Sequence, residues 1–193
     1  MSARQARSVA RWVRDELRVP FVVVGGSAIM ERYDVGSKDV DLLIAVGDWA
    51  RLDNSLENRR DATPLEPASG TIRSTRVVIG SSTVDVEFIS GQPFSGKRDA
   101  DDFIHYVRAY RSHVVDEVPY AHPAVVFYMR LGPGIEGWEL NFESIRRDLR
   151  FGVPIETLDE VVMIARHFGV DELLSERVQW VTERLQLFHR RPD

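Results

Sequence analysis

Two pairs of acidic residues are the side chains in this sequence best suited to hold a metal ion. Asp39 and Asp41 stand two residues apart at the start of an apolar run, and Asp85 and Glu87 have the same spacing in a later run. In a β-strand alternate side chains leave the same face, so each pair presents its two carboxylates together. Three carboxylates from adjacent strands can hold two Mg²⁺ ions roughly 3.5–4 Å apart, which suits in-line transfer at phosphorus. Such hard oxygen ligands favour Mg²⁺ or Mn²⁺ over zinc.

The sequence Gly25-Gly26-Ser27, called the glycine corner below, predicts a binding site for an anion. It follows the apolar residues 21–24, a predicted buried strand, and it opens a short predicted helix that extends to Arg32. The backbone amides at the start of this helix then point at whatever lies above the end of the strand. Glycine allows the backbone to approach a phosphate closely, and the Ser27 hydroxyl adds a further donor.

Short apolar runs predict the strands that carry these residues. Residues 21–24 and residues 40–46 have the continuous apolar pattern of buried strands. Residues 75–90 are typical of a β-hairpin that turns at Gly80. The first acidic pair therefore lies at the start of one predicted strand, and the second pair lies in the hairpin.

Helical patterns lie on both sides of these strands. Apolar residues recur at helical spacing between Ala6 and Leu17, and such patterns dominate the sequence beyond Pro123. We therefore expect an α/β fold of the α+β type, with a mixed β-sheet flanked by helices and a C-terminal helical segment. Residues 1–115 are the expected core with its N-terminal helix, and residues 116–193 are the expected helical segment packed on that core.

Five arginines form a stripe on the predicted N-terminal helix, opposite its apolar face. Their spacing alternates between three and four residues: Arg4, Arg7, Arg11, Arg14 and Arg18. Such a stripe is typical of a solvated helix face. Its alternative is a contact with RNA phosphates, which would make binding strongly dependent on salt.

Composition excludes several classes of protein. The chain has 193 residues, of which 44% are hydrophobic and 28% charged, and can bury one sizeable core. It contains no cysteine, which excludes disulfide scaffolds, thiolate zinc sites and cysteine nucleophiles. It has neither an apolar run long enough for a membrane helix nor a secretory signal, so we expect a soluble, cytoplasmic protein with no membrane partner. A net charge of −5 argues against wrapping of nucleic acid by the whole surface.

The order of these features resembles the nucleotidyltransferase superfamily of the DNA polymerase β type. The resemblance rests on three motifs in order: Gly25-Gly26-Ser27 with its short helix, Asp39-Val40-Asp41, and Val84-Asp85-Val86 in a later strand. Residues 25–44, GGSAIMERYDVGSKDVDLLI, are most similar to the minimal and abortive-infection-type nucleotidyltransferases, several of which act as toxins in toxin–antitoxin pairs. The resemblance covers about residues 20–90 and is only architectural over the helical half.

The resemblance implies an enzyme that transfers a nucleotide from an NTP such as ATP to a hydroxyl group, with Mg²⁺ or Mn²⁺ as cofactor. The implied catalytic and metal-binding residues are Asp39, Asp41 and Asp85. The implied nucleotide-binding residues are Gly25, Gly26, Ser27 and Lys38. The implied acceptor is an RNA or tRNA end, a protein side chain or a small hydroxylated molecule, and a toxin would also have an antitoxin protein as partner.

Three alternatives stay open at this point. Asp85 is preferred as the third acid because the family pattern has apolar residues on both sides of it, but Glu87 also has apolar neighbours. The helical half has no lysine for the triphosphate, and Arg130 is a candidate substitute. The alternative function is a module that keeps the fold and binds a nucleotide or a protein without turnover.

Overall fold

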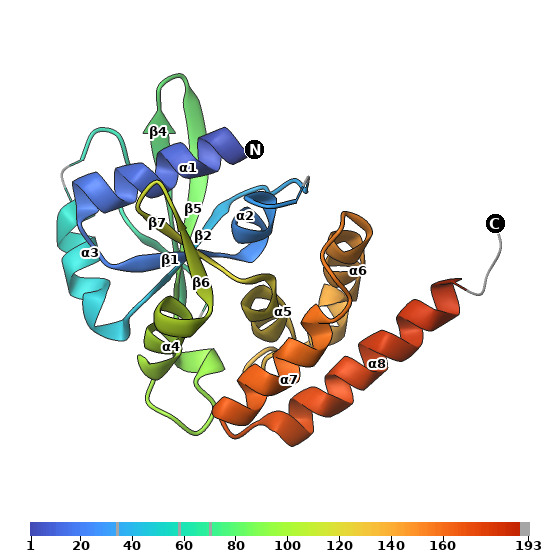
Figure 1. Ribbon diagram of the computed structural model, residues 1–193. Helices are drawn as coiled ribbons and strands as arrows, with labels where there is room; N and C mark the ends of the chain where they lie inside the picture. Colours follow the sequence, from blue (N-terminus) through green and yellow to red (C-terminus); the bar gives the residue numbers. More distant parts are fainter. Residues whose placement is uncertain (34, 58, 70, 190–193) are drawn as a thin grey trace.

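A seven-stranded mixed sheet forms the centre of the protein in the computed structural model, which describes residues 1–33, 35–57, 59–69 and 71–189 (Figure 1). Its strands lie in the order β3-β4-β5-β2-β1-β7-β6. Their bounds are β1 Phe21–Val24, β2 Val40–Ile44, β3 Glu66–Ser69, β4 Ile72–Ile79, β5 Ser82–Ser90, β6 Ser112–Val115 and β7 Val118–Ala121. Strand β1 is apolar and buried along its whole length because it has neighbours on both sides and helices over the sheet.

The register of the central strands determines which polar residues meet. Strand β2 runs antiparallel to β1 and parallel to β5, and β1 runs parallel to β7. Asp41 is paired with Val24, the last residue of β1, and with Glu87 of β5. The end of β1, the start of β2 and the middle of β5 therefore come together at one edge of the central strands.

Helices cover the sheet and extend beyond it. The described α-helices are α1 Ala3–Trp12, α2 Gly25–Met30, α3 Trp49–Leu56, α4 Asp102–Tyr110, α5 Pro123–Leu131, α6 Phe142–Arg150, α7 Thr157–His167 and α8 Asp171–His189. The shorter helical turns are η1 Val13–Leu17, η2 Val46–Asp48, η3 Gln92–Phe94 and η4 Trp138–Asn141. Helix α1 packs on β2, β4 and β7, and α5 packs on α2, α7 and α8. Figure 1 shows α5 to α8 grouped on one side of the molecule, away from α3.

This architecture confirms the predicted fold class. The sheet is mixed, helices flank it, and a run of helices follows it, consistent with the nucleotidyltransferase-like fold that the resemblance implies. Strand β2 ends at Ile44, two residues before the predicted end of the run, because a 3-10 turn begins at Val46. None of the described helices has the length and the apolar composition of a membrane span.

The predicted division after residue 115 falls inside a hairpin. Strands β6 and β7 pair antiparallel on either side of Asp116 and Glu117, and β7 pairs with β1 in the sheet. By secondary structure the helical segment therefore begins with α5 at Pro123. Its last residues, 190–193, lie outside the described residues.

Candidate active site

Three carboxylates converge where β2 begins beside β5. Asp39, Asp41 and Glu87 each offer an oxygen atom, and these oxygens lie within 4.8 Å of one another. Asp41 and Glu87 are direct neighbours in the parallel register, and Asp39 stands on the same side of the chain, two residues before Asp41. All three side chains are half-buried. The group has the donor chemistry and the spacing for a divalent cation such as Mg²⁺ or Mn²⁺.

The third member of this group is Glu87, whereas the sequence pattern favours Asp85. Asp85 leaves the same face of β5 as Glu87 but lies two residues before it. Because the register aligns Asp41 with Glu87, Asp85 lies further from Asp41. Its side chain is 67% exposed and pairs with Arg76 at 3.3 Å. Among the described residues the converging group thus contains Glu87, the alternative that the sequence left open, and Asp85 lies outside it.

The glycine corner packs directly against the carboxylates. Gly25 has a φ of +60°, and a Cβ atom there would lie 1.7 Å from Oδ2 of Asp41. A Cβ atom on Gly26 would lie 2.8 Å from Oγ of Ser37. Only glycine combines this backbone conformation with this close approach at position 25. Helix α2 begins at Gly25, so its first amide groups lie next to the acidic group.

The Ser27 hydroxyl makes a hydrogen bond within the protein. Its side chain is buried, with 1% of the residue exposed, and its hydroxyl donates to the backbone oxygen of Asp39 at 2.8 Å. The hydroxyl of Ser37 donates to the same oxygen at 3.0 Å. The Ser27 donor is therefore used inside the protein, where it ties α2 to the start of β2.

A cleft of about 1020 Å³ extends from the carboxylates to the helical segment. On the sheet side it is lined by Gly25, Gly26, Ser37, Lys38, Asp39 and Asp41. On the helical side it is lined by residues of α5, α6 and the connection between them, including Met129, Arg130, Ser144 and Arg147. Lys38 and Arg130, both singled out in the sequence, thus line the same cleft as Asp39 and Asp41.

A buried carboxylate joins two of the arginines on the helical wall. Asp148 has no exposed surface, and it accepts hydrogen bonds from Nη1 of Arg130 at 2.5 Å and from Nε of Arg147 at 3.1 Å. Sequence reasoning missed Arg147 and Asp148. Helical spacing places Asp148 on the buried face of α6 with Phe142 and Ile145, but nothing in the local pattern shows that Arg130 of α5 reaches it.

The pKa values of the acidic group reflect burial first and crowding of like charges second. Burial raises the pKa of Asp41 to about 7, with further contributions from the charges of Asp39 and Glu87, while Arg130 acts in the opposite direction. Burial also raises the pKa of Glu87, together with the charges of Asp39 and Asp85. Carboxylates held together in this way gain a favourable partner when a divalent cation binds between them.

Comparisons with known proteins give matches among solved structures. No protein-family model and no curated protein matches the sequence. A crystal structure of a candidate nucleotidyltransferase from H. pylori has a TM-score of 0.44 at 12% identity, over 96% of each chain. The solution structure of the antibiotic-resistance factor ANT(2'')-Ia has a TM-score of 0.43 at 14% identity, over 98% of this chain and 97% of the other.

A crystal structure of ANT(2'')-Ia in complex with adenylyl-2''-tobramycin has a TM-score of 0.42 at 14% identity, over 96% of this chain and 99% of the other. Because each TM-score lies below 0.5, the function proposed below rests on the geometry of the site.

Proposed function

We propose that this protein is a nucleotidyltransferase that depends on a divalent metal and moves a nucleotide from an NTP to a hydroxyl acceptor. One observation carries the proposal: Asp39, Asp41 and Glu87 converge against the glycine corner. The carboxylates suit a divalent cation, and the backbone amides of the glycine corner suit an anion. A triphosphate with a bound metal ion carries both a cation and negatively charged phosphates, so it matches both parts of the site.

The acidic group is the proposed metal site. Asp39, Asp41 and Glu87 would hold Mg²⁺ or Mn²⁺. The chemistry supplied by divalent ions bound at this position is activation of the attacking hydroxyl and stabilisation of the leaving pyrophosphate. The protein's own contribution is to hold the carboxylates in place, and the hydrogen bond from Ser27 to the backbone of Asp39 supports their orientation.

The two walls of the cleft are the proposed triphosphate site. The backbone amides of Gly25 and Gly26 at the start of α2 would donate hydrogen bonds to phosphate oxygens, and Lys38 lines the same wall. Arg130 lines the facing wall and already lies close enough to Asp41 to lower its pKa. Its partner Asp148 fixes the direction of its guanidinium group.

Calorimetry and a transfer assay test the proposal. We expect each NTP to bind in the presence of Mg²⁺ and much more weakly without it, and we expect labelled nucleotide to appear on an acceptor in total RNA, on protein or on a small hydroxylated compound. Asp39→Ala and Asp41→Ala should abolish metal-dependent binding. Unchanged binding in both variants would refute the site, and tight binding with no transfer to any acceptor would favour a module without turnover.

Toxicity is a separate prediction of the sequence resemblance. If the protein is the toxin of a toxin–antitoxin pair, its expression should arrest growth of a bacterial host, and Asp41→Ala should relieve the arrest. Normal growth at high expression of the intact protein would contradict this role while leaving the proposed chemistry in place.

A further inference from the structure

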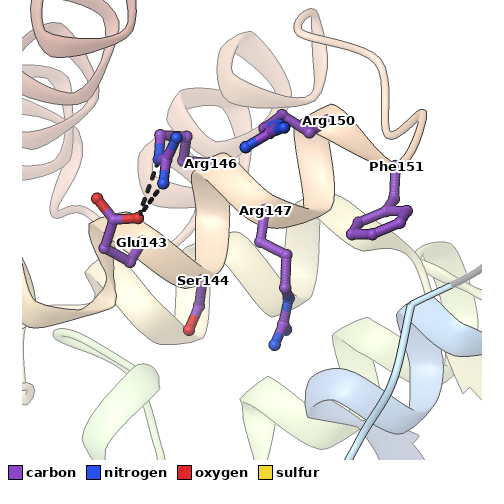
Figure 2. A pocket seen from close by; sticks show the side chains of 6 residues that line it. All are labelled: Glu143, Ser144, Arg146, Arg147, Arg150 and Phe151. Carbon is purple, nitrogen blue, oxygen red and sulfur yellow. Dashed lines mark hydrogen bonds and ion pairs between the residues drawn. The ribbon is translucent and has the colours of Figure 1, made fainter. Parts of the chain in front are cut away.

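A second pocket, of about 510 Å³, lies on α6 beside the cleft (Figure 2). It is lined by Glu143, Ser144, Arg146, Arg147, Arg150 and Phe151. Ser144 and Arg147 line both this pocket and the cleft, so the two spaces adjoin at α6. We call Arg146, Arg147, Arg150 and Phe151 the α6 arginine face.

The α6 arginine face carries more positive charge than its neighbours balance. Arg146 donates to Glu143 at 2.6 Å, and Arg147 shares the buried Asp148 with Arg130. Within the described residues no carboxylate pairs with Arg150. Arg130, Arg146 and Arg147 thus share two carboxylates, on a protein whose net charge is −5. The positive charge is a local feature of this helix and not a property of the whole surface.

The face is also accessible. Arg147 keeps 44% of its side chain exposed despite its bond to Asp148, and Phe151 is 51% exposed at the end of α6. In Figure 2 the side chain of Arg147 extends from α6 in a different direction from Arg150, while Phe151 follows Arg150 at the end of the helix. An exposed aromatic ring among guanidinium groups offers a surface for stacking as well as for phosphate contacts.

We propose that the α6 arginine face binds the phosphate backbone of a single-stranded nucleic acid, which is then the acceptor whose end enters the cleft. This inference rests on the proposed function. Guanidinium groups bind phosphate oxygens in bidentate fashion, and a positive groove with an aromatic ring is the combination used for single strands. Because pocket and cleft adjoin at Ser144 and Arg147, a strand held on α6 has a continuous path to the acidic group.

The test compares two double variants that remove the same charge from different helices. Arg146→Ala with Arg150→Ala removes two arginines from the α6 arginine face and spares Arg147, which lines the cleft. The control, Arg11→Ala with Arg14→Ala, removes two arginines from the α1 side that are held by Asp116, Asp15 and Glu117. Binding of a fluorescent single-stranded RNA oligonucleotide is measured by anisotropy across a salt series, and binding of Mg²⁺ with a non-hydrolysable NTP is measured by calorimetry.

We expect the α6 double variant to bind the oligonucleotide at least about tenfold more weakly and to lose about 1.4 from the slope of log K against log salt, the value for two phosphate contacts on a single strand. Its NTP affinity should stay within about twofold, and the control should match the unmodified protein. Thermal melting of all three proteins checks that they are folded.

Several results would overturn the inference. One is equal RNA binding by the α6 double variant and the control. Another is a loss of NTP affinity in the α6 double variant as large as its loss of RNA affinity, which would make the face part of the nucleotide site. Equal competition by poly-glutamate would show a general anion surface or an acidic protein partner. If the unmodified protein binds RNA through α6 but binds no NTP with Mg²⁺, the proposed function fails while the RNA site stands.

Discussion

The outer face of α1 and the cleft between β2 and α6 are both rich in charged side chains, but their charges are arranged differently. On α1, Arg7 pairs with Glu31 at 2.8 Å, and Arg11 pairs with Asp116. At the cleft, carboxylates gather on one wall and arginines on the other. Opposite charges that alternate cancel locally, whereas gathered like charges destabilise the fold unless a ligand neutralises them.

This difference separates the paired arginines of the α1 side, Arg7, Arg11 and Arg14, from the α6 arginine face, which is the candidate binding face. Arg14 has two carboxylate partners, Asp15 at 2.7 Å and Glu117 at 3.0 Å, so its charge is already compensated within the fold. Asp148 serves two arginines at once. Uncompensated charge of one sign in a concave site is a mark of function, since natural folds seldom keep it elsewhere.

The largest expected effect comes from removing the carboxylate that the cleft arginines share. Asp148→Asn leaves Arg130 and Arg147 without a counter-charge beside a buried amide, and we expect it to lower the free energy of unfolding by about 3 kcal/mol. That is the lower end of the range for a broken buried pair, because Arg147 stays partly exposed. Urea titration of the purified variant measures the free energy of unfolding. A loss below about 1 kcal/mol would show that this buried pair contributes no more than the exposed ion pairs of the α1 side.

A second prediction contrasts two acids on β5. Glu87→Gln should weaken Mg²⁺ or Mn²⁺ binding at least about tenfold, about 1.4 kcal/mol, because Glu87 belongs to the acidic group. Asp85→Asn should leave metal affinity nearly unchanged, because Asp85 is exposed and paired with Arg76. Calorimetric titration with Mn²⁺ compares them, and the reverse order of effects would restore Asp85 as the third ligand.

The third prediction concerns the pH dependence of stability in the metal-free protein. The pKa of Asp41 is about 7 in the fold against an ordinary value of 3.8, so the folded protein keeps a proton that the unfolded chain releases. This contribution to stability is complete below about pH 4 and is lost as pH rises to about 7.

Thermal melting in EDTA from pH 4 to pH 8 measures this loss. Asp41→Asn should flatten the fall in melting temperature by at least about 2–4 °C, the shift that each 1 kcal/mol gives in a chain of this size, whereas the control Asp116→Asn on the α1 side should keep it. Saturating Mg²⁺ should also reduce the fall in the unmodified protein, since the ion favours the ionised carboxylate. If melting temperature falls with pH as steeply in Asp41→Asn as in the unmodified protein, the carboxyl group with the raised pKa is not that of Asp41.

The smallest effect is expected for the α1 pairs themselves. Asp116 is 53% exposed in its pair with Arg11, and exposed ion pairs contribute little because water screens them. Asp116→Asn should therefore change the free energy of unfolding by less than about 1 kcal/mol in urea titration. A loss comparable with that of Asp148→Asn would show that the ion pairs of the two regions contribute equally to stability.

Local sequence patterns predicted the parts of the fold that depend on local chemistry. The apolar runs of β1 and β2 and the hairpin of β4 and β5 are evident from composition and spacing. The sequence pattern did not predict the β6–β7 hairpin because its turn uses Asp116 and Glu117 at positive φ, where glycine or asparagine is the usual signal. The sequence pattern did not predict strand β3 because Pro67 is typical of a loop. Proline is tolerated there because β3 lies at the edge of the sheet.

The candidate site divides in the same way. The glycine corner and the pair Asp39 and Asp41 follow from neighbours in the sequence, and the structure brings them together. The place of Glu87 in the site depends on the register between β2 and β5, and the sequence pattern of the two strands does not determine that register. Arg147 depends on how α6 packs on α5, and no spacing within either helix carries that information.

A crystal structure with Mn²⁺ and a non-hydrolysable NTP tests the central claim most directly, because anomalous scattering locates the ion without assumptions about the protein. We expect manganese about 2 Å from carboxylate oxygens of Asp39, Asp41 and Glu87, with the triphosphate against the amides of Gly25 and Gly26. Manganese bound elsewhere, or a triphosphate that leaves the glycine corner empty, would contradict the account.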